Sequence, residues 1–222
     1  MRLHTAPYSE QLKAWPPSGR HIMAQYDEST LVVYQAYRRS IAQYAVAHQR
    51  FGGEFGFGRM SWIKPNFLWM MFRCGWATKE NQECVLAVRI RRDAFDRILG
   101  GAVHSTFGAS RHPSQEARAR ALRSSEVRLQ WDPDHGPSGN RVERRALQLG
   151  LSGEVLHKYA TEWIVDIEDI TDFVREQHAS AIESNGDRLA VPVERPYYPS
   201  KAIAERIGLD AVGEPTTGPG AP

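Results

Sequence analysis

Residues 20–37 read RHIMAQYDESTLVVYQAY and carry the clearest structural signal in the chain. Two parts of this segment, 21–26 and 30–37, are rich in β-branched and aromatic residues, which favour strands. Between them, Asp-Glu-Ser at 27–29 is typical of a turn. The segment therefore predicts two strands joined by a short connection.

The second of these strands places polar side chains among apolar neighbours. Successive side chains of a strand point to opposite faces, so the pair Tyr34 and Ala36 faces one way and the pair Gln35 and Tyr37 faces the other. One member of each pair is therefore expected to be buried or to line a cleft. A buried glutamine needs hydrogen-bond partners for its amide, which makes Gln35 either an internal structural contact or a ligand contact.

Further strands and helices are expected on the C-terminal side, in mixed order. Strands are predicted at 83–91, 127–131, 145–149 and 163–167. Helices are predicted at 41–49, 66–74, 93–99, 115–123, 152–159 and 169–177. Pro and Gly predict a turn at 132–139. Because strands and helices do not alternate strictly, the sequence predicts an α+β fold with a mixed or largely antiparallel sheet and flanking helices.

The expected organisation is one globular domain between two irregular ends. Residues 1–19 contain three prolines and a glycine and are expected to form an irregular arm. Residues 213–222, GEPTTGPGAP, are too poor in apolar groups to order themselves and are expected to form a disordered tail. Residues 20–212 are the expected domain, and a chain of 222 residues is long enough to build its own core.

Composition excludes several classes of protein. No run approaches the roughly 20 apolar residues that cross a bilayer, and the first 20 residues lack the continuous apolar core of a secretory signal. Two cysteines, Cys74 and Cys84, provide neither a disulfide framework nor a four-cysteine zinc site. We therefore expect a cytoplasmic protein with reduced thiols and no membrane partner.

Charge is unevenly distributed along the chain. Residues 1–88 carry a net charge of +4, residues 89–150 carry +5, and residues 151–222 carry −7. Arginine outnumbers lysine by 23 to 5, and its planar guanidinium suits phosphate recognition, although codon bias in a GC-rich genome gives the same ratio. The basic middle segment is expected either to face a phosphorylated ligand or to pair with the acidic C-terminal third.

The most chemically suggestive segment is 59–79, RMSWIKPNFLWMMFRCGWATK. It holds three of the six tryptophans, and its four cations are Arg59, Lys64, Arg73 and Lys79. Rings that stack on a base and cations that hold a phosphate suit a nucleotide or an unpaired base. The same apolar run is also typical of a core helix whose cations reach the surface along their aliphatic stems.

A third segment, 130–135, reads Gln-Trp-Asp-Pro-Asp-His and is followed by Arg145 and Gln148. Two carboxylates and a histidine are compatible with a metal or with acid–base chemistry, but this spacing is also ordinary in a turn and lacks the HxH, HExxH or CxxC pattern of a metal site. No metal site is therefore predicted. The P-loop, GxGxxG and GxSxG motifs are absent too.

Several of these segments together carry a family resemblance. The sequence resembles the family catalogued as domain of unknown function 4291 over roughly residues 20–180, most specifically in WIKPNFLWMM at 62–71. The preceding residues 59–61 also contribute, as do the segments 24–27, 33–37, 75–78, 130–133 and 147–151. The resemblance implies a stand-alone soluble domain of about this length and no assigned activity.

Two classes of function remain open from the sequence. The first is a nucleotide-dependent enzyme, in its concrete form an NAD-consuming transferase acting on a nucleic acid or nucleotide, similar to the ADP-ribosyltransferase superfamily. Those small α+β domains use a strand Arg or His, aromatic stacking on nicotinamide and a late carboxylate. This analogy makes Arg20, Tyr34 and Glu83 the candidate catalytic residues and NAD the candidate cofactor. The superfamily's His-Tyr-Glu or Arg-Ser-Glu signature is not recognisable here, so the analogy rests on fold alone.

The second class is a non-catalytic module that binds RNA or a nucleotide, and a plainer alternative is an interaction domain whose aromatic segment is entirely core. The candidate ligand-binding residues are Gln35, Tyr37, Arg59, Trp62, Lys64, Arg73, Asp132, Arg145 and Gln148. A ligand site of either kind requires rings and cations from distant segments to meet in one cleft. The residues expected to converge there are Arg20, Tyr34, Arg59, Trp62 and Lys64.

Overall fold

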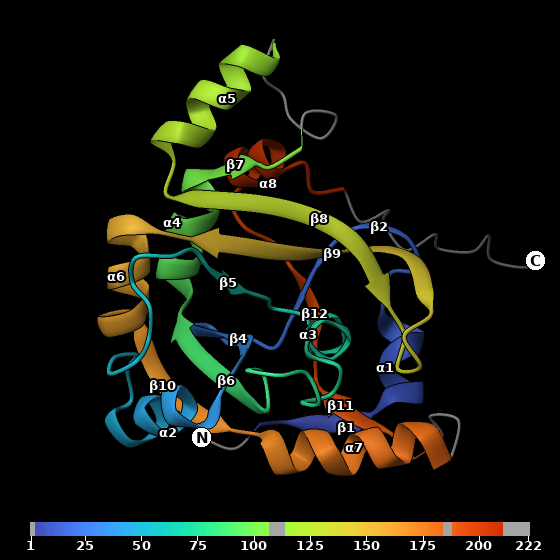
Figure 1. Cartoon of the computed structure of the whole chain (residues 1–222). Coiled ribbons are helices and arrows are strands. Elements are labelled where there is room, and N and C mark those ends of the chain that lie inside the picture. Colours follow the sequence, from blue (N-terminus) through green and yellow to red (C-terminus); the bar gives the residue numbers. More distant parts are fainter. Residues whose placement is uncertain (1–2, 107–113, 184–187, 211–222) are drawn as a thin grey trace, which may run out of the picture.

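Two main sheets carry the fold, and helices cover their outer sides (Figure 1). The computed structural model describes residues 3–106, 114–183 and 188–210. Its strands are β1 (Thr5–Pro7), β2 (Gly19–Arg20), β3 (Ile22–Ala24), β4 (Thr30–Tyr37), β5 (Ser61–Ile63), β6 (Cys84–Arg91), β7 (Ala102–His104), β8 (Val127–His135), β9 (Arg141–Leu151), β10 (Ile164–Asp169), β11 (Ala190–Pro192) and β12 (Arg195–Tyr197). Its helices are α1 (Tyr8–Ala14), α2 (Arg39–His48), α3 (Phe67–Cys74), α4 (Arg92–Gly101), α5 (Gln115–Ser124), α6 (Gly153–Thr161), α7 (Thr171–Glu183) and α8 (Lys201–Ile207). The α+β class and the single domain expected from the sequence are confirmed.

The first sheet has the order β10-β6-β4 and is antiparallel throughout. Strand β4 pairs with β6 from Thr30 opposite Arg91 to Tyr37 opposite Cys84. Both strands are buried on both faces, which explains why their sequences are apolar without strict alternation. Alternate side chains enter two different cores: Leu31 and Val33 lie in one, and Tyr34 lies in the other with Val32.

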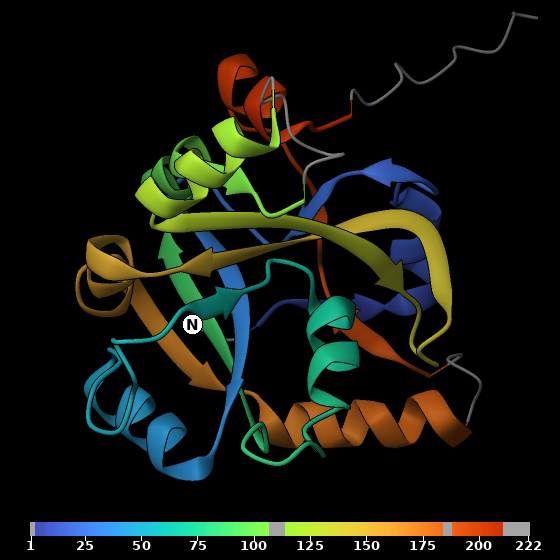
Figure 2. The same ribbon diagram turned by 45° about the horizontal axis from the view of Figure 1, so that its top comes forward.

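The second sheet has the order β2-β9-β8-β7, and β5 also pairs with β9. Its centre is the long hairpin of β8 and β9, which curves over the first sheet (Figure 2). The turn expected at 132–139 begins later in the structure. Strand β8 continues through Pro133, and the chain reverses at 136–140. Pro133 is tolerated because β7 pairs only with residues 127–129 of β8, so no neighbour on that side requires its missing N–H.

The N-terminal segment differs from the expected irregular arm. It contains β1, which pairs with β11, and the helix α1. Trp15 follows α1, is buried, and donates from its indole nitrogen to the backbone oxygen of Glu194 at 2.8 Å. Burial of this tryptophan helps to hold in place a segment whose prolines predicted irregular structure. The expected tail at 213–222 lies outside the described residues.

Helix α3 fits the expected span of 66–74 and is central to the candidate site. Asn66 caps its N-terminus, accepting a hydrogen bond from the backbone N–H of Trp69 at 2.7 Å. Gly75 ends the helix in the left-handed conformation with φ of 58°, which glycine adopts without steric cost. The helix lies between the curved hairpin and α7 in both ribbon views (Figures 1 and 2). Within the described residues, no helix has both the length and the apolar character that a membrane crossing requires.

Candidate functional site

The candidate site forms where a short connecting segment joins the two sheets. Strand β5 pairs with β9 in the second sheet, with Ser61 opposite Leu151. Directly after β5, Lys64 forms an isolated bridge to Tyr34 in β4 of the first sheet. The sequence 61–64 therefore crosses from one sheet to the other within four residues. The side chains of Ser61, Trp62 and Lys64 line a space to which β4, α3 and the β8–β9 hairpin also contribute residues.

A cavity of about 590 Å³ occupies this space. Eight residues that the sequence singled out as ligand contacts line it: Gln35, Tyr37, Arg59, Trp62, Lys64, Arg73, Asp132 and Gln148. They come from β4, β5 and its flanks, α3, β8 and β9. The convergence of these distant segments is the property that a ligand site requires.

Lys64 is the most unusual residue in the cavity. It is only 6% exposed and borders the cavity, and no hydrogen bond or ion pair of its ammonium group is found among the described residues. Burial, followed by the nearby positive charge of Arg73, lowers the pKa of Lys64 to about 8. The amine is therefore far easier to deprotonate than an exposed lysine.

One carboxylate faces Lys64 from the second sheet among the described residues of the lining. Asp132 accepts a hydrogen bond from the Gln130 amide at 2.8 Å and another from the Gln148 amide at 2.6 Å. Gln130 and Gln148 are directly opposite each other in the β8–β9 pairing, which brings both amides to one face of the hairpin. This arrangement fixes the carboxylate in position.

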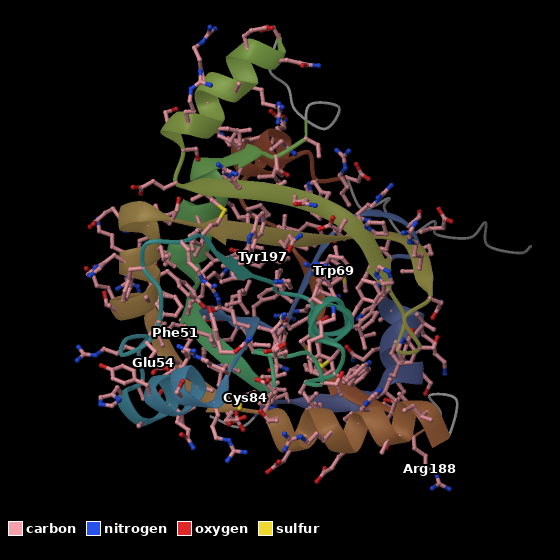
Figure 3. The ribbon with its side chains drawn as sticks, viewed as in Figure 1. Phe51, Glu54, Trp69, Cys84, Arg188 and Tyr197 are labelled. Atoms are coloured by element: carbon pink, nitrogen blue, oxygen red, sulfur yellow. The ribbon has the colours of Figure 1, made fainter. Side chains whose placement is uncertain are left out.

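Two indole rings contribute to the cavity wall. Trp62 is half-buried and packs over Gly150 of β9, where an added Cβ would lie 3.1 Å from the ring. Trp69 is buried in α3, stacks on Phe72 at a centroid distance of 5.5 Å, and lies near the hairpin (Figure 3). The guanidinium of Arg73 lies 5.9 Å from the Trp69 ring. Trp62 is therefore the ring with exposed area for a ligand, and Trp69 supports Arg73.

The floor of the cavity is a closed hydrogen-bond network. The Gln35 amide donates to the hydroxyl of Tyr37 at 2.6 Å and to that of Ser61 at 3.0 Å. Its carbonyl accepts from the buried Tyr159 hydroxyl at 2.6 Å. Two roles were left open for Gln35, an internal structural contact and a ligand contact. Its amide is bonded to protein groups, as in the structural role, and the residue also borders the cavity. This network holds β4, β5 and α6 together below the ligand space.

A second cavity of about 390 Å³ adjoins the first and shares Tyr37, Arg59, Ser61 and Asn81 with it. Its outer wall carries Glu54, which pairs with Arg38 at 2.9 Å. The two cavities are therefore neighbours, with Arg59 at their common boundary.

Residues 21–197 of the chain match the family described as Domain of unknown function (DUF4291). The chain belongs to DUF4291. The family resemblance expected from the sequence is thereby confirmed, and every cavity residue named above falls within the matched segment. Among curated proteins, none matches the chain.

Four candidate residues of this DUF4291 domain do not line the cavity: Arg20, Tyr34, Glu83 and Arg145. The backbone N–H of Arg20 donates to Asp210, and Glu83 accepts from the backbone of Asn81 at 2.7 Å. Tyr34 is fully buried, and burial raises its pKa well above the usual value. Of the five residues expected to share one cleft, the structure brings together Arg59, Trp62 and Lys64.

The DUF4291 cavity also has lining residues that sequence reasoning did not select: Met60, Ser61, Trp69, Met70, Asn81, Gln82 and Gln130. Ser61 lies between Arg59 and Trp62 in the sequence, so its position among candidate ligand contacts could have predicted it as a lining residue. Asn81 and Gln82 lie in a loop after α3 and carry no pattern of their own. Only the path of the chain brings that loop to the cavity.

The acidic cluster considered as a metal site takes other roles in the structure. Asp134 is buried and pairs with Arg144 at 2.7 Å, while His135 stacks on Phe72 with ring centroids 3.6 Å apart. Throughout the described part of the chain, no group of three or more His, Cys, Asp or Glu side chains is arranged to hold a metal ion.

Proposed function

We propose that the cavity binds a nucleotide, either free or as an unpaired residue of a nucleic acid strand. The observation that supports this proposal is the meeting of Arg59, Arg73 and Trp62 around one space with a single described carboxylate, Asp132. Guanidinium groups form paired hydrogen bonds with phosphate oxygens, and an indole face stacks on a base. The cavity volume is also within the range of sites for small ligands and cofactors.

Two features of the cavity determine the orientation of the bound nucleotide. Arg59 and Arg73 are exposed at the rim, where a phosphate keeps part of its hydration. Lys64 and the Gln35 network lie at depth, where the sugar and its substituents reach them. The phosphate is therefore assigned to the rim and the reacting part of the ligand to the interior.

In its enzymatic form, the proposal is a nucleotide-dependent transferase, with NAD consumption as the concrete candidate. Such a reaction benefits from a carboxylate near the developing positive charge of the ribose. Asp132 lines the cavity whereas Glu83 does not, so we now assign that role to Asp132. The alternative is a module that binds RNA or a nucleotide without turnover. The engagement of Asp132 by two glutamine amides favours this alternative, because those amides occupy part of its hydrogen-bonding capacity.

The two cysteines bear on where this function would take place. Cys74 and Cys84 are both free and buried. Free thiols fit a reducing compartment, so the proposal places the activity in the cytoplasm.

Binding is tested by calorimetry with AMP, adenosine and inorganic phosphate at several salt concentrations. The proposal requires AMP to bind more tightly than adenosine, and Arg73→Gln to weaken AMP about tenfold or more with little effect on adenosine. Arg123→Gln is the matched control, because Arg123 is exposed on α5, which does not line the cavity and projects away from α3 (Figure 1). Equal affinities for AMP and adenosine would contradict phosphate recognition.

Catalysis is tested by incubating the protein with NAD, with and without RNA, and measuring released nicotinamide. Release that Asp132→Asn abolishes and Glu83→Gln leaves intact supports the transferase with the assignment above. Release lost in Glu83→Gln would return that role to Glu83. Salt-sensitive RNA binding without release supports the binding module instead.

A further inference from the structure

Lys64 combines three properties that a phosphate-binding lysine does not need. Its side chain is almost completely buried, its ammonium group has no hydrogen bond or ion pair among the described residues, and it borders a cavity large enough for a ligand. A buried charge without a partner is costly, so folded proteins rarely retain one without a function. Phosphate recognition is already available from the exposed guanidinium groups at the rim.

The surroundings of Lys64 favour its neutral amine. Burial of the side chain removes water from the ammonium group and so disfavours its charged form. The positive charge of Arg73 also lowers the pKa of Lys64, whereas Cys74 and Asp132 raise it. A desolvated lysine beside another cation is the arrangement that activates an amine as a nucleophile.

We infer that Lys64 is a nucleophile that forms a Schiff base with the aldehyde of a phosphate-bearing ligand. This inference rests on the proposed function, since Arg59 and Arg73 hold the phosphate while the aldehyde reaches the interior. The relevant chemical class is a phosphorylated sugar with a free C1 aldehyde, which is what a nucleotide becomes when it loses its base.

The step needs no oxidant or other co-reactant. The Lys64 nitrogen attacks the carbonyl carbon, a C–N bond forms, and the carbonyl electron pair moves to oxygen, which takes a proton. The resulting carbinolamine loses that oxygen as water. The neutral amine gives up two hydrogens in all, and these balance the two hydrogens of the water. The product is an imine, which borohydride reagents reduce to a stable secondary amine.

The chain is well suited to a trapping experiment because it has only five lysines. Lys13, Lys79 and Lys201 are exposed, and Lys158 pairs with Glu154 on α6. At pH 7.5, a lysine with a pKa of about 8 has roughly 200-fold more neutral amine than an ordinary lysine. Selective reaction at Lys64 is therefore expected despite its burial.

The experiment treats the full chain with pyridoxal 5′-phosphate and cyanoborohydride, and peptide mass spectrometry locates the adduct. At substoichiometric reagent, Lys64 should be labelled about tenfold or more above each other lysine, and unphosphorylated pyridoxal should label it far less. A second arm uses ribose 5-phosphate, which should give the same adduct site. Labelling spread over all five lysines, or equal labelling by the two pyridoxals, would overturn the inference.

Variants separate this inference from the proposed function. Lys64→Met should remove the adduct, whereas Lys201→Met, at an exposed site on α8 outside the cavity lining, should leave it unchanged. Wild-type protein that binds AMP but gives no Lys64 adduct would refute the Schiff base and leave nucleotide binding standing. Failure of both AMP binding and labelling would remove the proposed function as well. The wild-type labelling pattern needs no variant, so a folding defect in Lys64→Met would not obscure the result.

Discussion

Tyr34 and Lys64 exchange both of their backbone hydrogen bonds. The Tyr34 N–H donates to the Lys64 carbonyl at 2.7 Å, and the Lys64 N–H donates to the Tyr34 carbonyl at 3.3 Å. This pair joins the segment that leaves the second sheet to the edge of the first. The backbone of Lys64 is thereby fixed between two cores, and its side chain cannot move to the surface without breaking the junction.

The first prediction concerns the cost of burying Lys64. Replacing it by Met should raise the free energy of unfolding at pH 7 by about 2–3 kcal/mol, because a buried ammonium whose pKa falls from 10.5 to about 8 opposes folding by about that amount. Thermal and denaturant unfolding measure the change.

The pH dependence provides the control for this effect. The folded-state pKa of Lys64 is below its unfolded value, so wild-type stability should rise with pH between about 8 and 10.5. The Lys64→Met variant should lack that rise. A destabilised variant with an unchanged pH profile would show that Lys64 is not a buried charge.

The second prediction tests Tyr34 as a catalytic residue. Its hydroxyl is buried and has no hydrogen-bond partner among the described residues, while its ring packs on Phe67 at a centroid distance of 5.5 Å. Tyr34→Phe should therefore be neutral or stabilising by about 1 kcal/mol, since it removes an unpaired polar group and keeps the ring. Ligand binding should be unchanged. A variant that folds normally and loses turnover would instead establish a catalytic role for the hydroxyl.

The third prediction concerns the network beneath the cavity. Gln35→Leu should destabilise the fold by about 2–4 kcal/mol, because it leaves buried hydroxyls of Ser61 and Tyr159 without their amide partner. Tyr159→Phe should cost less, and the double variant should cost less than the sum of the two. Additive effects in this double-mutant cycle would mean that the network does not act as a unit.

The fourth prediction compares two neighbouring arginines. Arg144 is buried and pairs with the equally buried Asp134, so Arg144→Met should cost about 3–5 kcal/mol by leaving that carboxylate alone. Arg145 is exposed, and Arg145→Met should change stability by about 0.5 kcal/mol or less. Urea denaturation of both variants makes the comparison, and equal effects would be inconsistent with the buried pair.

The fifth prediction concerns Glu194, which lies between β11 and β12 and contacts the first residue of α3. Its carboxylate accepts from the Phe67 N–H at 2.6 Å, but burial raises its pKa well above the usual value. A raised folded-state pKa stabilises the protein at low pH, and that contribution is lost as pH rises through the folded value. Glu194→Gln should therefore be at least as stable as wild type at neutral pH and lack the decline above pH 4.5. A parallel decline in both proteins would exclude Glu194 as its source.

Much of the candidate site could be predicted from residue types alone. Rings and cations crowd into residues 59–73, and the polar tips of Gln35 and Tyr37 interrupt an apolar strand, so those positions stood out before any fold was known. Arg20 and Glu83 stood out by analogy with another superfamily, and the structure places them away from the cavity lining. Analogy of fold gives no information about where a particular side chain lies.

The irregular ends show the limits of composition. Prolines in residues 1–19 indicate breaks in regular structure, but they give no information about what packs against Trp15. One partner of that ring is Arg144, whose guanidinium lies 5.0 Å from it and donates to the backbone oxygen of Pro16 at 2.9 Å. A contact across more than a hundred residues leaves no periodic trace in the sequence.

The amino-acid sequence by itself determined the α+β class, the main strands β4 and β6, the span of α3 and the family, because β-branched runs, capping residues and turn residues act locally. Tertiary structure alone decided that β5 joins two sheets and that Lys64 becomes a buried amine that lines the same cavity as Asp132 and has no partner in the part of the chain that the structure describes. The physical reason is that burial and electrostatic environment depend on which distant segments pack together. The ionisation of Lys64 is therefore set by the fold, while its presence is set by the sequence.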